Sequence, residues 1–216
     1  MAANSDRFSD WMWRDSPVNA SIVVGSQERK TIFIIKRALL MQHSLFFLNA
    51  FNGGFREART GVLHLPETDV QTFEIFTNWM RFDNLPTLIG PDPTRTRLEM
   101  VNMKDFINVY AFAHLYQVNK LEDRLKNDYM AAFFPKVQDS LEAFDLFPSD
   151  ESISSILTEL PEYSKLSRAV ANAIVTLYND EYDGALLFKF RQSRELRQKI
   201  TTIGGRITST RRRWRR

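Results

Sequence analysis

The fold of this chain is decided by residues 21–47, which read SIVVGSQERKTIFIIKRALLMQHSLFF. Two runs rich in β-branched residues, 22–24 and 30–35, are separated by a short polar segment that opens with a glycine. Such runs joined by a polar turn predict a β-hairpin. Good helix formers follow in residues 36–41, and Ser44 stands where its side chain would cap a second helix. The stretch therefore predicts a hairpin followed by two short helices.

A third strand is predicted by residues 61–66, GVLHLP, which Pro66 ends. Side chains alternate between the two faces of a strand, so Leu63 and Leu65 share one face while Val62 and His64 share the other. At least one of these faces is expected to be buried. Thr68 or Asp69 is then expected to cap a helix whose apolar side chains recur every three or four residues, namely Val70, Phe73, Phe76, Thr77 and Met80.

Further helices are predicted along the rest of the chain. Asn52-Gly53-Gly54 is expected to end the second helix with a glycine in the left-handed conformation. Residues 83–100 read as a loop because prolines and glycines interrupt them. Helices are then expected from Asn102 to about Phe133, with a break at 117–119, and over 136–147 and 151–180, with Pro148 and Pro161 as breakers. Glu122 is expected to pair with Lys126, and the pair Glu122 and Asp123 is expected on a solvated helix face.

The charge is unevenly distributed. Residues 189–216 contain eleven Lys and Arg and one acid, Glu195, so this segment carries +10, whereas the whole chain of 216 residues carries only +3. The remaining 188 residues therefore carry −7. The basic side chains could engage phosphates, anionic lipid or a nuclear import receptor. The residues singled out for nucleic-acid or import-receptor binding are Arg211, Arg212, Arg213, Trp214, Arg215 and Arg216. A solvated, disordered terminus is the alternative interpretation.

Several classes of function are not supported by the sequence. The chain has no cysteine, which excludes a disulfide framework, a thiolate zinc site and a cysteine nucleophile. It shows no nucleophile elbow and no phosphate-binding loop, and its three histidines lack ligand spacing. No apolar run is long enough to span a membrane, and no signal peptide is recognisable. We therefore expect no enzymatic activity, no cofactor, no metal and an intracellular location in the cytoplasm, the nucleus or both.

The order of these motifs resembles the BTB/POZ domain. SIVVG at residues 21–25 is similar to its first strand, and FIIKRALLMQHSLFF at 33–47 to its first helical region. FNGGFREA at 51–58, followed by GVLHLPETD at 61–69, is similar to its turn and third strand. NVYAFAHLYQVNKLEDRL at 108–125 is similar to the helix pair that ends the domain. FFLNAFNGGFREA and YQVNKLE resemble the fungal type of this family in particular.

The resemblance implies an α+β fold, in which a small mixed sheet is flanked by helices and followed by additional helices. It implies residues 19–134 as the BTB/POZ domain and 135–182 as a helical extension, between a flexible arm at 1–18 and a basic, disordered tail at 183–216. The arm carries Trp11-Met12-Trp13 ahead of Pro17, which reads as a flexible terminus or a short docking helix.

The function implied by the resemblance is a non-enzymatic protein–protein interaction module, acting as a scaffold or adaptor. A substrate adaptor of a cullin-type ubiquitin ligase is one alternative, and a nuclear or nucleic-acid-associated protein acting through its tail is another. The family's usual Asp is Asn19 here, which weakens self-association, and its His-Lys pair is Lys36-Arg37. Its apolar-x-Glu motif is reduced to Glu99, with Arg97 two positions earlier. The residues assigned to protein interaction are Asn19, Lys36, Arg37, Phe82 and Glu99.

Overall fold

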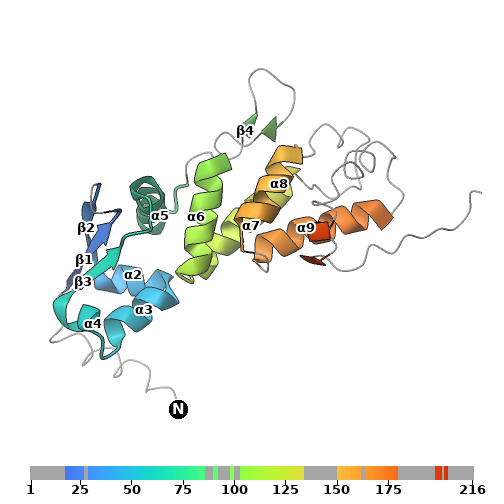
Figure 1. The fold of residues 1–216 in the computed structure, drawn as a ribbon. Helices are drawn as coiled ribbons and strands as arrows, with labels where there is room; N and C mark the ends of the chain where they lie inside the picture. Colours follow the sequence, from blue (N-terminus) through green and yellow to red (C-terminus); the bar gives the residue numbers. More distant parts are fainter. Residues whose placement is uncertain are drawn as a thin grey trace, which may run out of the picture. The chain divides into compact units, whose positions relative to one another are not determined.

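The computed structural model describes residues 18–26, 29–85, 90–91, 98–99, 103–133, 150–161, 164–179, 198–200 and 202–203. The chain divides into two compact units, the first made of residues 1–86 and 112–121 and the second of residues 87–111 and 122–216. The described residues combine a small mixed sheet with many helices (Figure 1). The predicted α+β class is thus confirmed. The predicted boundary after residue 134 lies outside the described residues and stays a prediction.

The first unit contains a three-stranded sheet in the order β2-β1-β3. Strand β1 (Asn19–Val24) pairs antiparallel with β2 (Thr31–Lys36), which confirms the predicted hairpin, and parallel with β3 (Val62–Leu65). Gly25 follows β1 with a φ of 97°, and a Cβ at this position would collide with the carbonyl oxygen of Arg29. The hairpin turn therefore requires glycine here.

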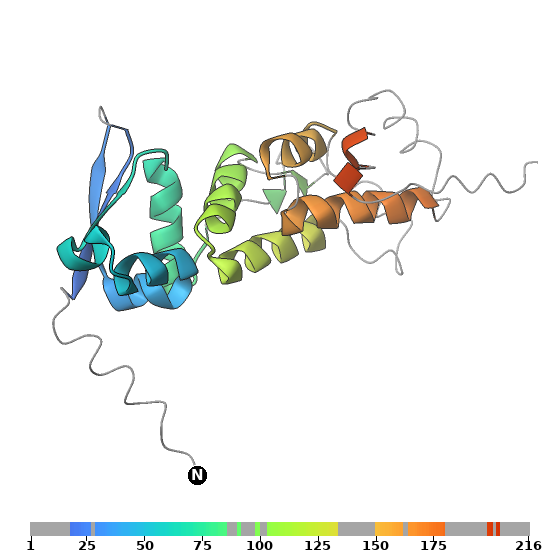
Figure 2. The ribbon, with the colours of Figure 1, turned by 60° about the horizontal axis from the view of Figure 1, so that its bottom comes forward.

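Four helices of the first unit accompany the sheet: α2 (Arg37–His43), α3 (Leu45–Asn52), α4 (Arg56–Thr60) and α5 (Val70–Phe82) (Figure 2). Two predicted caps are confirmed. The hydroxyl of Ser44 accepts a hydrogen bond from the Phe47 amide at 3.1 Å, and a carboxylate oxygen of Asp69 accepts one from the Thr72 amide at 3.0 Å. Each side chain satisfies an amide that the first turn of a helix leaves without an intrahelical partner.

The segment between α3 and β3 differs from the expectation. Gly53 has a φ of −81° and a ψ of 176°, so the predicted left-handed end of α3 is wrong. Its amide still bonds the Asn49 carbonyl at 3.0 Å, and the chain leaves the helix in an extended conformation. A short helix that the sequence patterns did not predict, α4, occupies the following residues. Gly61, with a φ of 72°, is the left-handed residue that ends α4.

One face of the sheet packs into an aromatic core. Ala20, Ile22, Ile35, Leu63 and Leu65 are buried on this face, as the alternation of β3 predicted. The ring of Phe33 on β2 meets Phe73 of α5 edge-on, with 4.8 Å between centroids. Farther from the sheet, Phe47 stacks on Phe51, Phe76 and Tyr116 at 6.1–6.4 Å. Most of the aromatic side chains described in this unit are therefore used in its interior.

The second unit is mainly helical. It contains the first part of α6 (Met103–Leu115), most of α7 (Asn119–Phe133), and the packed pair α8 (Asp150–Glu159) and α9 (Lys165–Asn179). Pro161 separates α8 from α9, as predicted. The short strands β4 (Gly90–Pro91) and β5 (Leu98–Glu99) pair within the stretch expected to be loop. The helix predicted over 136–147 lies outside the described residues.

Candidate protein-interaction site

Three of the predicted interaction residues lie together at one end of the hairpin. Asn19 and Lys36 are register partners on β1 and β2, and both are exposed. Arg37, in contrast, is only 1% exposed, and burial lowers the pKa of its guanidinium. That guanidinium lies 5.1 Å from the ring centroid of Phe51 and donates to the Glu57 carbonyl at 3.4 Å. Asn19 and Lys36 thus face solvent, whereas Arg37 anchors α2 beneath them.

The other predicted residues lie on separate elements. Phe82 is the last residue of α5 and is 72% exposed, next to Asp83, which ends the helix with a left-handed φ of 51°. Glu99 belongs to β5 in the second unit, where its backbone pairs with that of Gly90. The six residues proposed in the arginine-rich tail, 211–216, and the tryptophans of the arm lie outside the described residues. The interaction role of all these residues stays a prediction.

The second face of the sheet is a partly exposed apolar surface, and the predicted site residues do not include it. On β2, Ile32 is 61% exposed and Ile34 is 67% exposed. Their register partners on β1, Val23 and Ser21, are half-buried. The signal was present in the sequence, because TIFIIK is apolar at consecutive positions and cannot bury both faces of an edge strand. We call this surface the open sheet face, made of Ser21, Val23, Ile32, Ile34, Val62 and His64.

A second apolar position of the first unit is the leucine pair, Leu45 and Leu115, both exposed. The hydroxyl of Ser44 donates to the Tyr116 carbonyl at 2.6 Å, so the backbone positions adjoining the two leucines are held together. Within the part of the chain that the structure describes, every exposed large hydrophobic side chain belongs to the first unit. Contiguous exposed apolar surface often marks a site at which a protein binds another protein.

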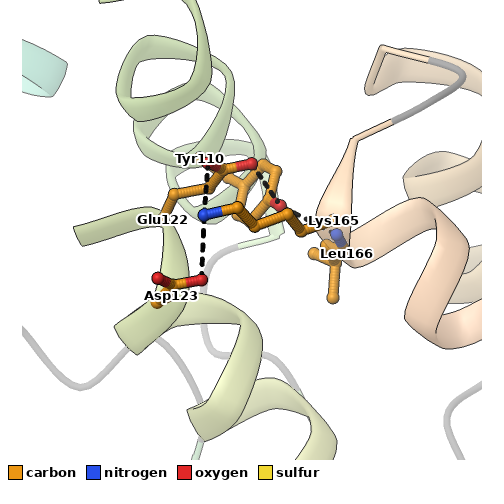
Figure 3. A network of polar contacts seen from close by, with 5 residues as sticks. All are labelled: Tyr110, Glu122, Asp123, Lys165 and Leu166. Carbon is orange, nitrogen blue, oxygen red and sulfur yellow. Dashed lines mark hydrogen bonds and ion pairs between the residues drawn. The ribbon is translucent and has the colours of Figure 1, made fainter. Parts of the chain in front are cut away.

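The second unit contains a polar network that reaches from its surface into its core (Figure 3). The hydroxyl of Tyr110 on α6 donates to Oε1 of Glu122 on α7 at 3.0 Å and accepts from the amide of Leu166 on α9 at 2.8 Å. Lys165 Nζ lies 3.4 Å from Glu122 Oε2 and 3.0 Å from Asp123 Oδ1. The network therefore joins three helices through one tyrosine hydroxyl and one carboxylate.

Burial distinguishes the members of this network. Glu122 is only 3% exposed, so the expectation that it lies on a solvated helix face is wrong. Burial, together with the charge of Glu122, raises the pKa of the Tyr110 hydroxyl. The hydrogen bond to Asp123 raises the pKa of the Lys165 ammonium, although this lysine remains partly solvated. A carboxylate buried at low dielectric needs a hydrogen-bond donor and a nearby cation, and Glu122 has both. These directional contacts hold the three helices in one relative position.

His43 is the histidine with the most unusual surroundings. Its ring meets the ring of Trp79 edge-on at 5.3 Å, and its Nδ1 finds no hydrogen-bond partner among the described residues. Burial, followed by the charge of Lys120, lowers the pKa of this imidazole. The imidazole is half-buried in the first unit, and both effects favour its neutral form. Among the residues the structure describes, no group of three or more His, Cys, Asp or Glu is placed to hold a metal ion.

No family model matches the chain, and no curated protein matches it. The solved structures similar to it include the BTB domain of human gigaxonin, with 12% sequence identity and a TM-score of 0.38 over 59% of this chain and 96% of that chain. They also include the BTB domain of zebrafish PATZ1, with 9% identity and a TM-score of 0.36 over 60% and 96%.

Likeness at this level does not assign the chain to a family. In the described ranges, no helix is both long and apolar enough to cross a membrane.

Proposed function

We propose that the chain is a non-enzymatic protein–protein interaction module of the BTB type, in which the first unit binds the partner. The sequence resemblance supports the type, and the fold agrees with the order of elements that this resemblance implies. The observation that carries the proposal is that, among the described residues, the exposed large apolar side chains belong to the first unit. Burial of a few such anchors supplies most of the affinity in protein interfaces.

The leucine pair is the first surface to test, because buried hydrogen bonds hold the backbone next to both leucines in place. Ser44 caps α3 through the Phe47 amide and bonds the Tyr116 carbonyl at the same time, so the turn after α6 is tied to the start of α3. A partner that buries both leucines would meet a preformed surface and would not need to order these segments. Preformed surfaces lose less conformational entropy on binding than mobile ones.

The test is a pull-down from cell extract, combined with size-exclusion chromatography and light scattering, for three forms of the full chain. Leu45→Asp/Leu115→Asp is expected to lose the partner, or the self-association, that the wild-type chain retains. Gln42→Asp, which adds a charge at an exposed position of α2, is the matched control and is expected to retain it. A strictly monomeric wild-type chain that retains no partner would contradict the proposal.

A cullin partner would make the module a ligase adaptor. Calorimetry with a purified cullin N-terminal region tests this finer proposal, with Glu99→Ala as the variant expected to weaken binding. Absence of heat at high protein concentration would remove the adaptor role and leave the interaction module in place.

The basic segment supports a separate proposal, that nucleic acid or an import receptor binds at residues 189–216. Eleven cations in this segment predict nucleic-acid affinity that falls steeply with salt. Deleting residues 189–216 is expected to abolish this binding and leave capture of the protein partner unchanged. Unchanged nucleic-acid binding and localisation after the deletion would remove this proposal alone.

A further inference from the structure

The open sheet face has a charge pattern as well as an apolar centre. Along β2, the side chains of Ile32, Ile34 and Lys36 point to this face, because alternate residues of a strand share a face. Phe33 and Ile35 point to the opposite face, toward Phe73 and the core. The open sheet face therefore presents two isoleucines followed by a cation in a straight row along one strand.

The arm that precedes β1 carries the complementary pattern. In the sequence DWMWRD, at residues 10–15, Trp11, Trp13 and Asp15 occur at every second position. An extended chain would place these three side chains on one face, with Met12 and Arg14 on the other. Two large aromatic groups followed by an anion thus match two isoleucines followed by a cation, with the same period of two.

The direction of the chain fits the same pairing. The arm reaches the sheet at Asn19, whose register partner on β2 is Lys36. A reversal within Ser16-Pro17-Val18 would bring Asp15 over Lys36, then Trp13 over Ile34 and Trp11 over Ile32. Both segments advance by about 3.3 Å per residue when extended, so the three pairs stay in step. Proline and serine are residues typical of such a turn.

The size of the open sheet face argues for a tethered segment over a second copy of the chain. Three strands of four to six residues, about 4.8 Å apart, present a face of about 300 Å². Stable interfaces between proteins bury about 800 Å² on each partner. A segment joined to β1 needs no such area, because its effective concentration at the face is on the order of millimolar.

We propose that residues 11–15 of the arm dock on the open sheet face over β2, with Trp13 on Ile34, Trp11 on Ile32 and Asp15 beside Lys36. The arm then covers the apolar centre of this face in the isolated protein, and any partner of the face must displace it. The contact is intramolecular.

Disulfide trapping in the full chain tests this docking, because the chain has no cysteine of its own. The variant Trp11→Cys/Ile32→Cys is oxidised under mild conditions and followed by thiol titration and non-reducing electrophoresis. Trp11→Cys/His64→Cys is the matched control. His64 is exposed and lies in the same row of the sheet, since Val23 is the register partner of both Ile32 and His64, but two strands away from β2.

The expected result is a monomeric disulfide that forms at least about tenfold faster in the Ile32 pair than in the His64 pair. Adding Trp13→Ser is expected to reduce the faster rate to that of the control. Lys36→Asp is expected to slow the reaction and Asp15→Lys, added to it, to restore the rate. Unfolding midpoints by circular dichroism verify that each variant is folded.

Three outcomes would overturn the docking. Equal rates for the two pairs would mean that the arm has no fixed seat on the sheet. Disulfide-linked dimers whose rate rises with protein concentration would assign the face to a second copy. Acceleration in the Ile32 pair that survives both Trp13→Ser and Lys36→Asp would exclude the proposed contacts.

Discussion

The two units of the chain are stabilised in different ways. The first is held by stacked and edge-on aromatic rings around Phe47 and leaves apolar side chains such as Ile34 and Leu115 in solvent. The second has a buried polar network in which Tyr110, Glu122 and Lys165 join α6, α7 and α9. The difference teaches that a unit built mainly on aromatic packing can leave apolar surface exposed, whereas directional hydrogen bonds suit the unit in which helices must keep one relative position.

Removing a central ring is the strongest way to break the first unit. Phe47→Ala is expected to lower the free energy of unfolding by about 3–5 kcal/mol, because Phe47 is fully buried and stacks on three other rings. Chemical denaturation followed by circular dichroism measures the loss. Leu45→Ala, in the same helix but exposed, is the control and is expected to cost less than about 1 kcal/mol. Equal losses for the two variants would contradict the described core.

Removing one hydroxyl should break the second unit more selectively. Tyr110→Phe is expected to cost about 1–3 kcal/mol, because it leaves the Leu166 amide and the Glu122 carboxylate without their shared partner. Hydrogen exchange of the Leu166 amide should accelerate, while amides of β1 keep their protection. Glu122→Gln combined with Tyr110→Phe should cost less than the sum of the single changes. Strict additivity would mean that the two side chains act independently.

Acid is expected to lower the stability of the first unit through His43. The pKa of His43 is lowered in the folded chain by burial and by Lys120, whereas the unfolded chain binds this proton at about pH 6.5. The unfolded state therefore holds more protons below that pH, and the contribution of His43 to stability is lost as the pH falls. His43→Phe is expected to flatten the decrease in unfolding midpoint between about pH 6.5 and 5. If the unfolding midpoint of His43→Phe decreases as much as that of the wild-type chain, other groups cause the acid sensitivity.

Alkali is expected to lower the stability of the second unit through Tyr110 and Lys165. The pKa values of Tyr110 and Lys165 are both raised in the folded chain, so their contributions are present below about pH 10 and are lost as the pH rises above it. Unfolding midpoints across this range should fall in the wild-type chain and fall less in Tyr110→Phe. His43→Phe serves as the control here and should leave the alkaline decrease unchanged.

The smallest effect is expected at the surface of α7. Arg124 Nε and Asp128 Oδ2 lie 2.8 Å apart, but both side chains are about half exposed, at 50% and 45%. Asp128→Asn is expected to change the free energy of unfolding by less than about 0.5 kcal/mol, because solvent screens such pairs. Denaturation at low and high salt gives the measurement. If Asp128→Asn lowered the free energy of unfolding as much as Tyr110→Phe does, surface and buried polar contacts would contribute equally to the stability of this unit.

Local signals predicted the fold well wherever one segment decides its own structure. The hairpin, the caps at Ser44 and Asp69, the buried leucines of β3 and the break at Pro161 each depend on a few adjacent residues. The left-handed glycine is predicted within Asn52-Gly53-Gly54 but occurs at Gly61, because the pattern does not reveal α4 between them.

The surroundings of single polar side chains were harder to predict. Glu122 is buried because Tyr110 lies 12 positions earlier and Lys165 lies 43 positions later, and no spacing rule within one helix contains that information. The sequence TIFIIK indicates that one face of β2 carries exposed apolar side chains. Which face of the strand is covered depends on Phe73 of α5, which packs on Phe33. Sequence therefore located the elements, and tertiary partners decided which side chains are available for a site.

The parallel pairing of β1 with β3 has a consequence for how the chain folds. The hairpin β1–β2 closes over a short turn, on a timescale of about 1–10 μs for such elements. The ladder between β1 and β3 joins Ser21 to Val62, with three helices in between, and such non-local pairing forms more slowly. Until β3 arrives, one edge of β1 is open to the strands of other nascent chains. Changes at the exposed His64 of β3, which leave the buried Leu63 and Leu65 in place, should therefore affect the yield of folded protein at high concentration more than its final stability.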